Sequence, residues 1–487
     1  MKTPFSLLLA GILIAQAGCT MAPKYARPAT PVPASWPSGP AYAPAPAPTA
    51  LTAPDMDWRE FFTDEKLLQF IGTALTNNRD LRIAALNVER ARAYYGIARS
   101  DLFPVVNATG SGSKARVPAD LSSTGTRHTV ESYGVNLGVA SWEIDFFGRI
   151  RSLKDRALQE YLATDQARRS AQILLVSSVA QAYLALAADQ ENLTLAETTL
   201  KAQQAAYDLV KRRFDLGLVP ELEAFRAQTP LEVARRDVAS YTQRVAQDQN
   251  ALDLLLGTPT PPDLLPAALS VVTPPADISA GVSSEVLLGR PDVVQAEDLL
   301  KAANADIGAA RAAFFPRISL STAIGTASSD LSGLFKSGSG AWSYAPQIVM
   351  PIFDARTWSA AKAAKVQREI AVVQYEKVIQ SAFRDVADAL AVRGTVNQQV
   401  SAQQSLVNAL SETYRLANSR FDKGIDSYLG VLDAQRSLFA AQQVLVLLRL
   451  EQLTIQVRLY AVLGGGAPAP EPHLTAASGD SVGQRHN

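Results

Sequence analysis

The chain has 487 residues, and its 46 lysines and arginines balance 46 aspartates and glutamates, so no polyelectrolyte partner such as a nucleic acid is indicated. Its single cysteine, Cys19, excludes an intrachain disulfide and a cysteine-based metal cluster. Three scattered histidines leave little material for a histidine metal site or a catalytic triad. We therefore expect no enzyme, no cofactor and no metal.

The N-terminus is typical of a secretion signal spanning residues 1–18. A basic start precedes an apolar run that is too short to span a membrane. Small residues directly before Cys19 resemble a bacterial lipobox, in which the cysteine becomes the lipidated mature N-terminus. Gln16 stands where lipoboxes usually carry leucine, so an ordinary signal peptide with an incidental cysteine stays an alternative. Thr20, which is not aspartate, favours an outer membrane destination.

Residues 19–63 form a segment rich in proline and alanine, which favours extended geometry and packs no core of its own. Ordered structure is predicted to begin at Trp58. Asp64 is expected to cap a helix that runs towards Arg99.

Two strands are predicted at 105–117 and 128–142. The second repeat is predicted to have one strand through Ile318, Leu320 and Ile324 and another from Trp342 to Ile352. Each strand is long enough to cross a bilayer when tilted, although two soluble hairpins would have the same pattern. Four strands cannot close a barrel, and lipid does not tolerate open sheet edges. Three copies would supply twelve strands, so a homotrimer is the simplest membrane-competent assembly.

Two very long helices are predicted at 149–215 and 356–422, each about 100 Å long at ~1.5 Å per residue. Shorter return helices follow near 219–257 and 425–463, and Pro230 predicts a kink in the first of them. Apolar-favouring positions spaced three and four residues apart predict coiled-coil seams, and the second return helix has Leu429, Leu432, Arg436 and Phe439 on its seam. Two further helices, at 64–100 and 284–313, are expected to complete the wall of a helical tube.

The chain is one unit duplicated. Arg213, Phe214 and Gly217 match Arg420, Phe421 and Gly424 at an offset of 207 residues. Each glycine supplies the backbone freedom for a tight turn between helices. The predicted organisation is a first repeat at 64–263, a linker at 264–283, a second repeat at 284–466 and a disordered tail at 467–487.

Motifs spread over nearly the whole mature chain resemble the TolC/OprM-type outer membrane factors, in particular their lipoprotein (NodT-like) branch. The motifs include DWREFF, NRDLRIAALNVERARA, SWEIDFFGRIRS, RFDLGLVPELE, GRPDVVQAE, PIFDARTW and GIDSYLGVLDAQRSLFAAQQ. The resemblance implies a mainly helical homotrimeric tube. A twelve-stranded β-barrel in the outer membrane, with four strands per chain, would continue into a long α-helical barrel across the periplasm.

The resemblance also implies an iris that closes the periplasmic end at Leu429 and Asp433. These residues lie four apart on one helix face, and in a trimer each would form a ring of three. Leu429 as an ordinary seam leucine and Asp433 as a solvated acid remain alternatives. Some relatives carry a second acid where this chain has Gly430, which thins the anionic ring. Weaker candidates for ties between hairpins are Glu223, Arg226 and Asp426.

The two hairpin ends resemble surfaces that meet periplasmic adaptor proteins, and the candidate docking residues are Arg213, Phe214, Gly217, Arg420, Phe421 and Gly424. The same residues could simply build the turns. The function implied is a passive exit channel of a tripartite efflux pump, with an inner membrane RND-type transporter supplying the energy. A tunnel for type I protein secretion and a trimeric coiled-coil adhesin or spacer are the alternatives. The substrate is not encoded in these patterns.

Overall fold

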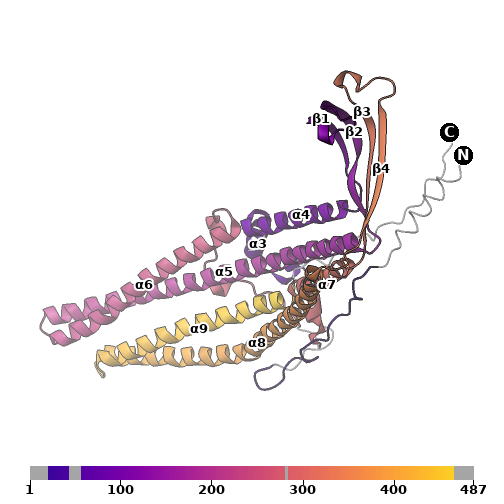
Figure 1. The fold of residues 1–487 in the computed structure, drawn as a ribbon. Coiled ribbons are helices and arrows are strands. Elements are labelled where there is room, and N and C mark those ends of the chain that lie inside the picture. The colour runs from indigo at the N-terminus through magenta and orange to yellow at the C-terminus, as the bar shows by residue number, and fades with distance from the viewer. Residues whose placement is uncertain (1–19, 43–55, 280–282, 466–487) are drawn as a thin grey trace, which may run out of the picture. The chain divides into compact units, whose positions relative to one another are not determined.

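The computed structural model describes residues 20–42, 56–279 and 283–465 (Figure 1). Cys19, the predicted signal and the predicted tail lie outside these described residues. The chain divides into two compact units. The first contains 86–165, 295–377 and the chain before Thr30, and the second contains the remainder.

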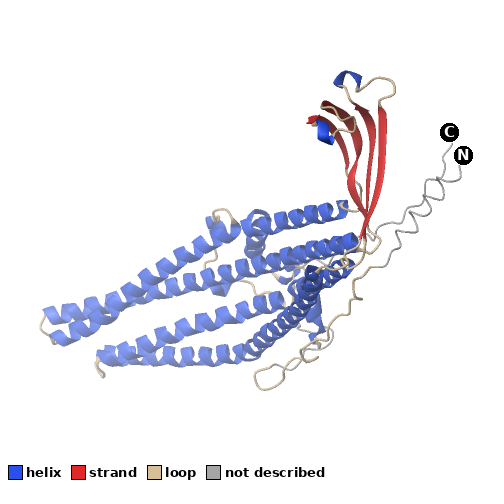
Figure 2. Ribbon diagram, viewed as in Figure 1, coloured by secondary structure: helices blue, strands red, loops and turns tan. Residues whose placement is uncertain are grey.

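The first unit is built on a four-stranded antiparallel sheet in chain order (Figure 2). Its strands are β1 (Val106–Val117), β2 (His128–Ile144), β3 (Arg317–Ser328) and β4 (Gly340–Val349). The four predicted strands are confirmed, with bounds that differ by a few residues. β2 pairs with β3, so the hairpins of the two repeats join into one sheet. In the described chain, β1 and β4 are edges with one neighbouring strand each.

Two glycines allow β2 and β3 to approach closely. A Cβ on Gly325 would overlap the carbonyl oxygen of Val135, and a Cβ on Gly138 would overlap that of Thr322. No side chain fits at either position without moving a backbone, because in each case the obstacle is main chain rather than a flexible side chain.

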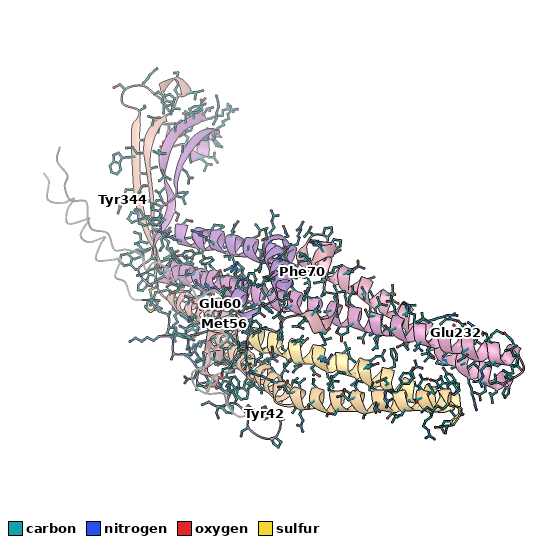
Figure 3. The ribbon with its side chains drawn as sticks, turned by 180° about the vertical axis from the view of Figure 1, so that it is seen from behind. Tyr42, Met56, Glu60, Phe70, Glu232 and Tyr344 are labelled. Atoms are coloured by element: carbon teal, nitrogen blue, oxygen red, sulfur yellow. The ribbon has the colours of Figure 1, made fainter. Side chains whose placement is uncertain are left out.

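Large apolar side chains of this sheet are exposed in the single chain. Trp342 is 80% exposed, and Tyr344 stands on β4 in Figure 3. Others exposed in the same way are Val130, Leu137, Ile324 and Ile348. So many exposed apolar groups are unusual for a sheet that faces water and suit one that meets lipid or further protein.

The predicted long helices are confirmed. They are α5 (Arg149–Asp215) and α8 (Ala355–Asp422), which turn into α6 (Glu221–Leu256) and α9 (Tyr428–Val462). Parts of α5 and α9 are apolar enough to cross a membrane by length and composition alone, but most of the apolar window of α5 is buried, as expected of a packing helix. Pro230 lies inside α6, where the predicted kink stays a prediction.

The predicted helix over 64–100 is wrong in one respect, because it is two helices, α3 (Glu65–Asn77) and α4 (Arg79–Ser100). Asn78 between them is extended, its Oδ1 accepts from the Leu81 N–H at 2.9 Å, and its Nδ2 donates to the Leu255 carbonyl at 2.9 Å. One side chain therefore caps α4 and binds the end of α6. The predicted cap at Asp64 is present, since its Oδ1 accepts from the Leu67 N–H at 2.9 Å.

The helix predicted at 284–313 also begins later than expected. A 3-10 helix at Ser284–Gly289 precedes α7 (Pro291–Ala312), and Arg290 between them is extended. A residue before proline is pushed out of the helical region, whereas proline itself fits the first turn of a helix.

An aromatic core in the second unit holds α2 (Trp58–Phe61) against the end of α9. Phe61 of α2 stacks on Tyr460 with ring centroids 4.1 Å apart. The Tyr460 hydroxyl donates to the Met56 carbonyl at 2.8 Å, and Phe62 packs edge-on. Figure 3 labels Met56 and Phe70 in this unit.

The proline-rich segment within residues 20–42 lies against helices. In the first unit, the Arg27 guanidinium donates two bonds, of 3.1 and 2.7 Å, to the buried carboxylate of Glu297 on α7. In the second unit, Trp36 stacks on Phe383 of α8 at 5.2 Å. The proline-rich segment is therefore held by single side chains that bind to helices, because its composition does not form a hydrophobic core of its own.

The close approach at Gly325 generates a prediction. Gly325→Val would force main-chain atoms of β2 and β3 apart, at a cost of about 1–3 kcal/mol or more. We expect the yield of folded protein in the outer membrane fraction to fall sharply, with loss of β signal in circular dichroism. Gly110→Val is the matched control, because Gly110 of β1 has open space around its Cβ position. Equal yields of the two variants would contradict the packing described.

Candidate functional site: the ends of the helical hairpins

The first hairpin ends in a glycine turn that terminates α5. Gly217 has φ +71° and donates to the Phe214 carbonyl at 2.8 Å, while the Leu218 N–H donates to the Arg213 carbonyl at 2.8 Å. These two bonds define a Schellman motif, which satisfies the last carbonyls of a helix and favours glycine. The repeated Arg-Phe-Asp-x-Gly sequence therefore encodes a helix stop.

The second hairpin repeats this turn and adds an ion pair. Gly424 has φ +70°, and the Ile425 N–H donates to the Arg420 carbonyl at 2.9 Å. The Arg420 guanidinium donates to both carboxylate oxygens of Asp426, at 2.5 and 3.1 Å, which lowers the pKa of Asp426. Val219 occupies the equivalent position of the first hairpin, so this ion pair is not repeated there.

A hydrophobic cluster joins the ends of the two hairpins within the second unit. Val210 of α5, Ala227 of α6, and Tyr428 and Val431 of α9 are its buried members. Phe421 of α8 packs against Tyr428 with ring centroids 5.1 Å apart. Burial raises the pKa of Tyr428 to about 12, in keeping with a hydroxyl that is shielded from water. The hairpin ends are thus held together by packing.

This packing divides α9 into two faces. Tyr428 and Val431 are buried, whereas Leu429 is 46% exposed and Asp433 is exposed on the same stripe. The predicted seam through Leu429 and Arg436 is therefore wrong for this stretch within one chain, because the inner face is displaced by one residue. Leu429 is not a buried seam leucine, since its side chain is about half exposed at the open groove between α6 and α9.

The charged candidates pair locally. Asp433 accepts from Arg436 at 3.0 Å and Glu223 accepts from Arg226 at 3.2 Å, each within its own helix. Exposed pairs of this kind are worth about 0–1 kcal/mol and are readily exchanged. Ties between hairpins through Arg226, Glu223 or Asp426 therefore stay a prediction.

The duplication equates Arg226 with Asp433 and Leu222 with Leu429 at the same offset of 207. Arg226 and Asp433 also line one pocket of about 400 Å³ between α5, α6 and α9, together with Leu429. Opposite charges thus stand at matching positions of the two hairpins. This correspondence was not recognised from the sequence, although the offset was the signal that could have found it.

Beyond the cluster, the hairpin ends expose apolar side chains. Leu216, Leu218, Phe225 and Ile425 are each more than half exposed. Phe214 and Phe421 are only partly exposed, and Phe421 packs against the cluster, so Phe421 contributes to the interior of the hairpin end as well as to its surface. Among the described residues, no group of three or more histidine, cysteine, aspartate or glutamate side chains is placed to hold a metal ion.

Comparison with known proteins identifies the fold. The family model for outer membrane efflux proteins matches residues 70–258 and 282–465. The probable efflux pump outer membrane protein TtgC of Pseudomonas putida is 48% identical over 466 residues, covering 96% of each chain. The cation efflux system protein CusC of Escherichia coli is 42% identical, covering 95% of this chain and all of CusC.

Solved structures agree. The open state of the MtrE outer membrane channel of Neisseria gonorrhoeae superposes with a TM-score of 0.83 at 37% identity, covering 92% of this chain and 99% of MtrE. The predicted family, the mainly helical fold with its small antiparallel sheet, and the outer membrane location are confirmed. The chain belongs to the outer membrane efflux protein family.

Proposed function

We propose that three copies of this chain form the outer membrane exit duct of a tripartite efflux pump. The relatives named as pump components support this assignment, and so does the sheet, whose two edge strands need partners before lipid can surround them. Three copies of four strands make a twelve-stranded barrel. A periplasmic adaptor and an inner membrane RND-type transporter would complete the pump, and small compounds such as drugs would be its cargo.

The observation that supports a gate is the exposure of Leu429 and Asp433 on one stripe of α9. Leu429 and Asp433 stay exposed although the neighbouring Tyr428 and Val431 are buried, so the helix keeps an apolar and an anionic group for a surface outside the chain. Around a three-fold axis these would form an apolar ring and an anionic ring that attracts cations. Arg226 at the matching position of the first hairpin would alternate with Asp433 and tie neighbouring hairpins.

The exposed apolar ends of the hairpins support adaptor docking. Leu216, Leu218 and Ile425 are each more than half exposed, and the hydrogen bonds of the two Schellman turns fix the backbone that carries them. A partner that buries such side chains gains about 25 cal/mol per Å² of apolar surface. The docking surface would thus lie on the residues next to Gly217 and Gly424 rather than on the phenylalanines.

Single-channel conductance of purified trimers tests the gate. Removing a ring of charge worth about 1 kcal/mol to a passing cation changes its local concentration about fivefold. We expect Asp433→Ala to lose cation selectivity for this reason, and to conduct more because the proposed tie between Asp433 and Arg226 is also lost. Asp215→Ala, which removes an exposed acid at the other hairpin end, is the control and should behave as wild type. A pore unaffected by Asp433→Ala would retain the duct and reject this gate.

The cluster at Tyr428 predicts a second phenotype. Truncation of this buried ring in Tyr428→Ala costs about 3–5 kcal/mol of packing, so the hairpin ends should separate and the channel should dwell in higher-conductance states. Tyr428→Phe keeps the ring and should remain closed. If Tyr428→Ala trimers conduct like the wild type, the cluster does not hold the closed state.

Lipidation at Cys19 is tested by growth with labelled palmitate. We expect label on the wild type and none on Cys19→Ser, while the variant still fractionates with the outer membrane because the barrel remains. An unlabelled wild type would support the ordinary signal peptide instead.

A further inference from the structure

Two acidic side chains meet on the shaft of the first hairpin. Asp189 of α5 and Asp248 of α6 lie within hydrogen-bonding reach of each other, and Asn192 of α5 contacts Asp189. Counting back from Asp215, the pair lies about 40 Å from the hairpin end at ~1.5 Å per residue. It is therefore separate from the proposed gate.

The pair sits in an environment that disfavours two negative charges. Asp248 Oδ2 is buried without a hydrogen-bond partner, and so is the Oδ1 of Asn192, a side chain that is only 3% exposed. Two carboxylates in contact cannot both ionise without strong repulsion, and burial adds to the penalty. Arg244 is the cation that acts on both. One proton on the pair, with Arg244, leaves the group neutral.

Asn192 of α5 acts on Asp189, and Arg244 of α6 acts on both acids. Tyr241 of α6 lies near Asp189, and Asp237 of α6 and Gln443 of α9 act on Tyr241 rather than on the pair. Glu191 of α5 and Arg449 of α9 face each other. Arg244 lies over the Tyr241 ring at 5.2 Å, so its charge is shared between the ring and the acids. Glu191 accepts from the Ser270 N–H at 3.1 Å and lies 3.9 Å from Arg449, so both are engaged elsewhere.

The first hairpin is bonded to the second close to the Asp189–Asp248 pair along the hairpin axis. Gln443 of α9 donates to the Tyr241 hydroxyl at 2.8 Å, and Arg449 of α9 faces Glu191 of α5. A change in how α5 and α6 pack at Asp189 and Asp248 would therefore be transmitted to α9 through Tyr241.

We propose that Asp189 and Asp248 share one proton and act as a pH-dependent latch, which holds α5 against α6 where α9 is bonded to this hairpin. When the proton is lost, the two carboxylates repel each other, the hairpin loosens and the Tyr241–Gln443 contact weakens. The proposal needs neither the gate residues nor a trimer, so it stands independently of the proposed function.

The direction of the pH effect follows from burial. Burial, followed by the charge of Asp189, raises the pKa of Asp248 to about 6, and burial raises the pKa of Asp189 as well. An acid whose folded-state pKa is raised favours the folded form at low pH. That contribution is lost as the pH rises through the folded-state value, here near 6, and the proton belongs to the pair rather than to either residue.

Infrared difference spectroscopy of the purified full-length protein between pH 5 and pH 7.5 tests the shared proton. The wild type should lose the C=O band of a protonated carboxylic acid, and Asp248→Asn and Asp189→Asn should each lack that component. Asp237→Asn is the control on the same helix, because Asp237 is paired with Arg236 at 2.6 Å and lies outside the pair. A component that persists in both variants overturns the proposal.

Hydrogen exchange tests the latch. After correction for intrinsic rates, amides of 185–195 and 241–252 should exchange severalfold faster at pH 7.5 than at pH 5 in the wild type and in Asp237→Asn. Asp248→Asn, a neutral mimic of the protonated form, should stay slow at both pH values. A wild type without this pH dependence rejects the latch. Protection restored at pH 7.5 by Ca²⁺ or Na⁺ would show that a cation, not a proton, occupies the pair.

Discussion

Packing between the ends of the two helical hairpins decides what each surface of this chain is free to do. Tyr428 and Val431 of α9 are buried against Val210 and Ala227 of the other hairpin. Since an α-helix presents residues three and four apart on one face, this burial leaves Leu429 and Asp433 on a separate, exposed stripe beside α6. The same cluster therefore sets both the geometry of the hairpin end and the identity of the exposed stripe.

The sheet imposes the complementary constraint. Within the described chain, β1 and β4 each have one neighbouring strand, and Trp342, Ile348 and Leu137 are exposed. Main-chain groups at a sheet edge need hydrogen-bond partners when lipid replaces water, so this unit is incomplete as a single copy. Gly138 and Gly325 allow β2 and β3 to approach closely, and this pairing joins the strands of both repeats into one sheet within a single chain.

The duplication made most of this fold predictable, and the departures from prediction have local physical causes. The strands, the long helices and the glycine turns follow from periodicity and from residues such as Gly217 and Gly424, whose φ values are positive. The break at Asn78 was missed because its side chain bonds to Leu255, which is remote in sequence. The seam through Leu429 was misassigned because a heptad pattern does not say which of two adjacent stripes packs against the neighbouring helices. In the structure the stripe with the larger side chain, Tyr428, is the buried one. The Asp189–Asp248 pair has no sequence signature, since it exists only once α5 and α6 are antiparallel.

Stability is distributed unevenly along the hairpins, and this distribution suits the gate proposed for their ends. Between α2 and the end of α9, Phe61, Phe62 and Tyr460 form a buried aromatic core, with the Tyr460 hydroxyl bonded to the Met56 carbonyl. At the hairpin ends, the charged contacts are exposed pairs worth about 0–1 kcal/mol each, and the buried cluster is small. A partner that binds the open form more tightly by about 5.5 kcal/mol moves a two-state equilibrium from 1:99 to 99:1. Such a difference is comparable to the packing of one buried aromatic side chain, so docking on the exposed leucines could open the ends while the aromatic core holds the helices together.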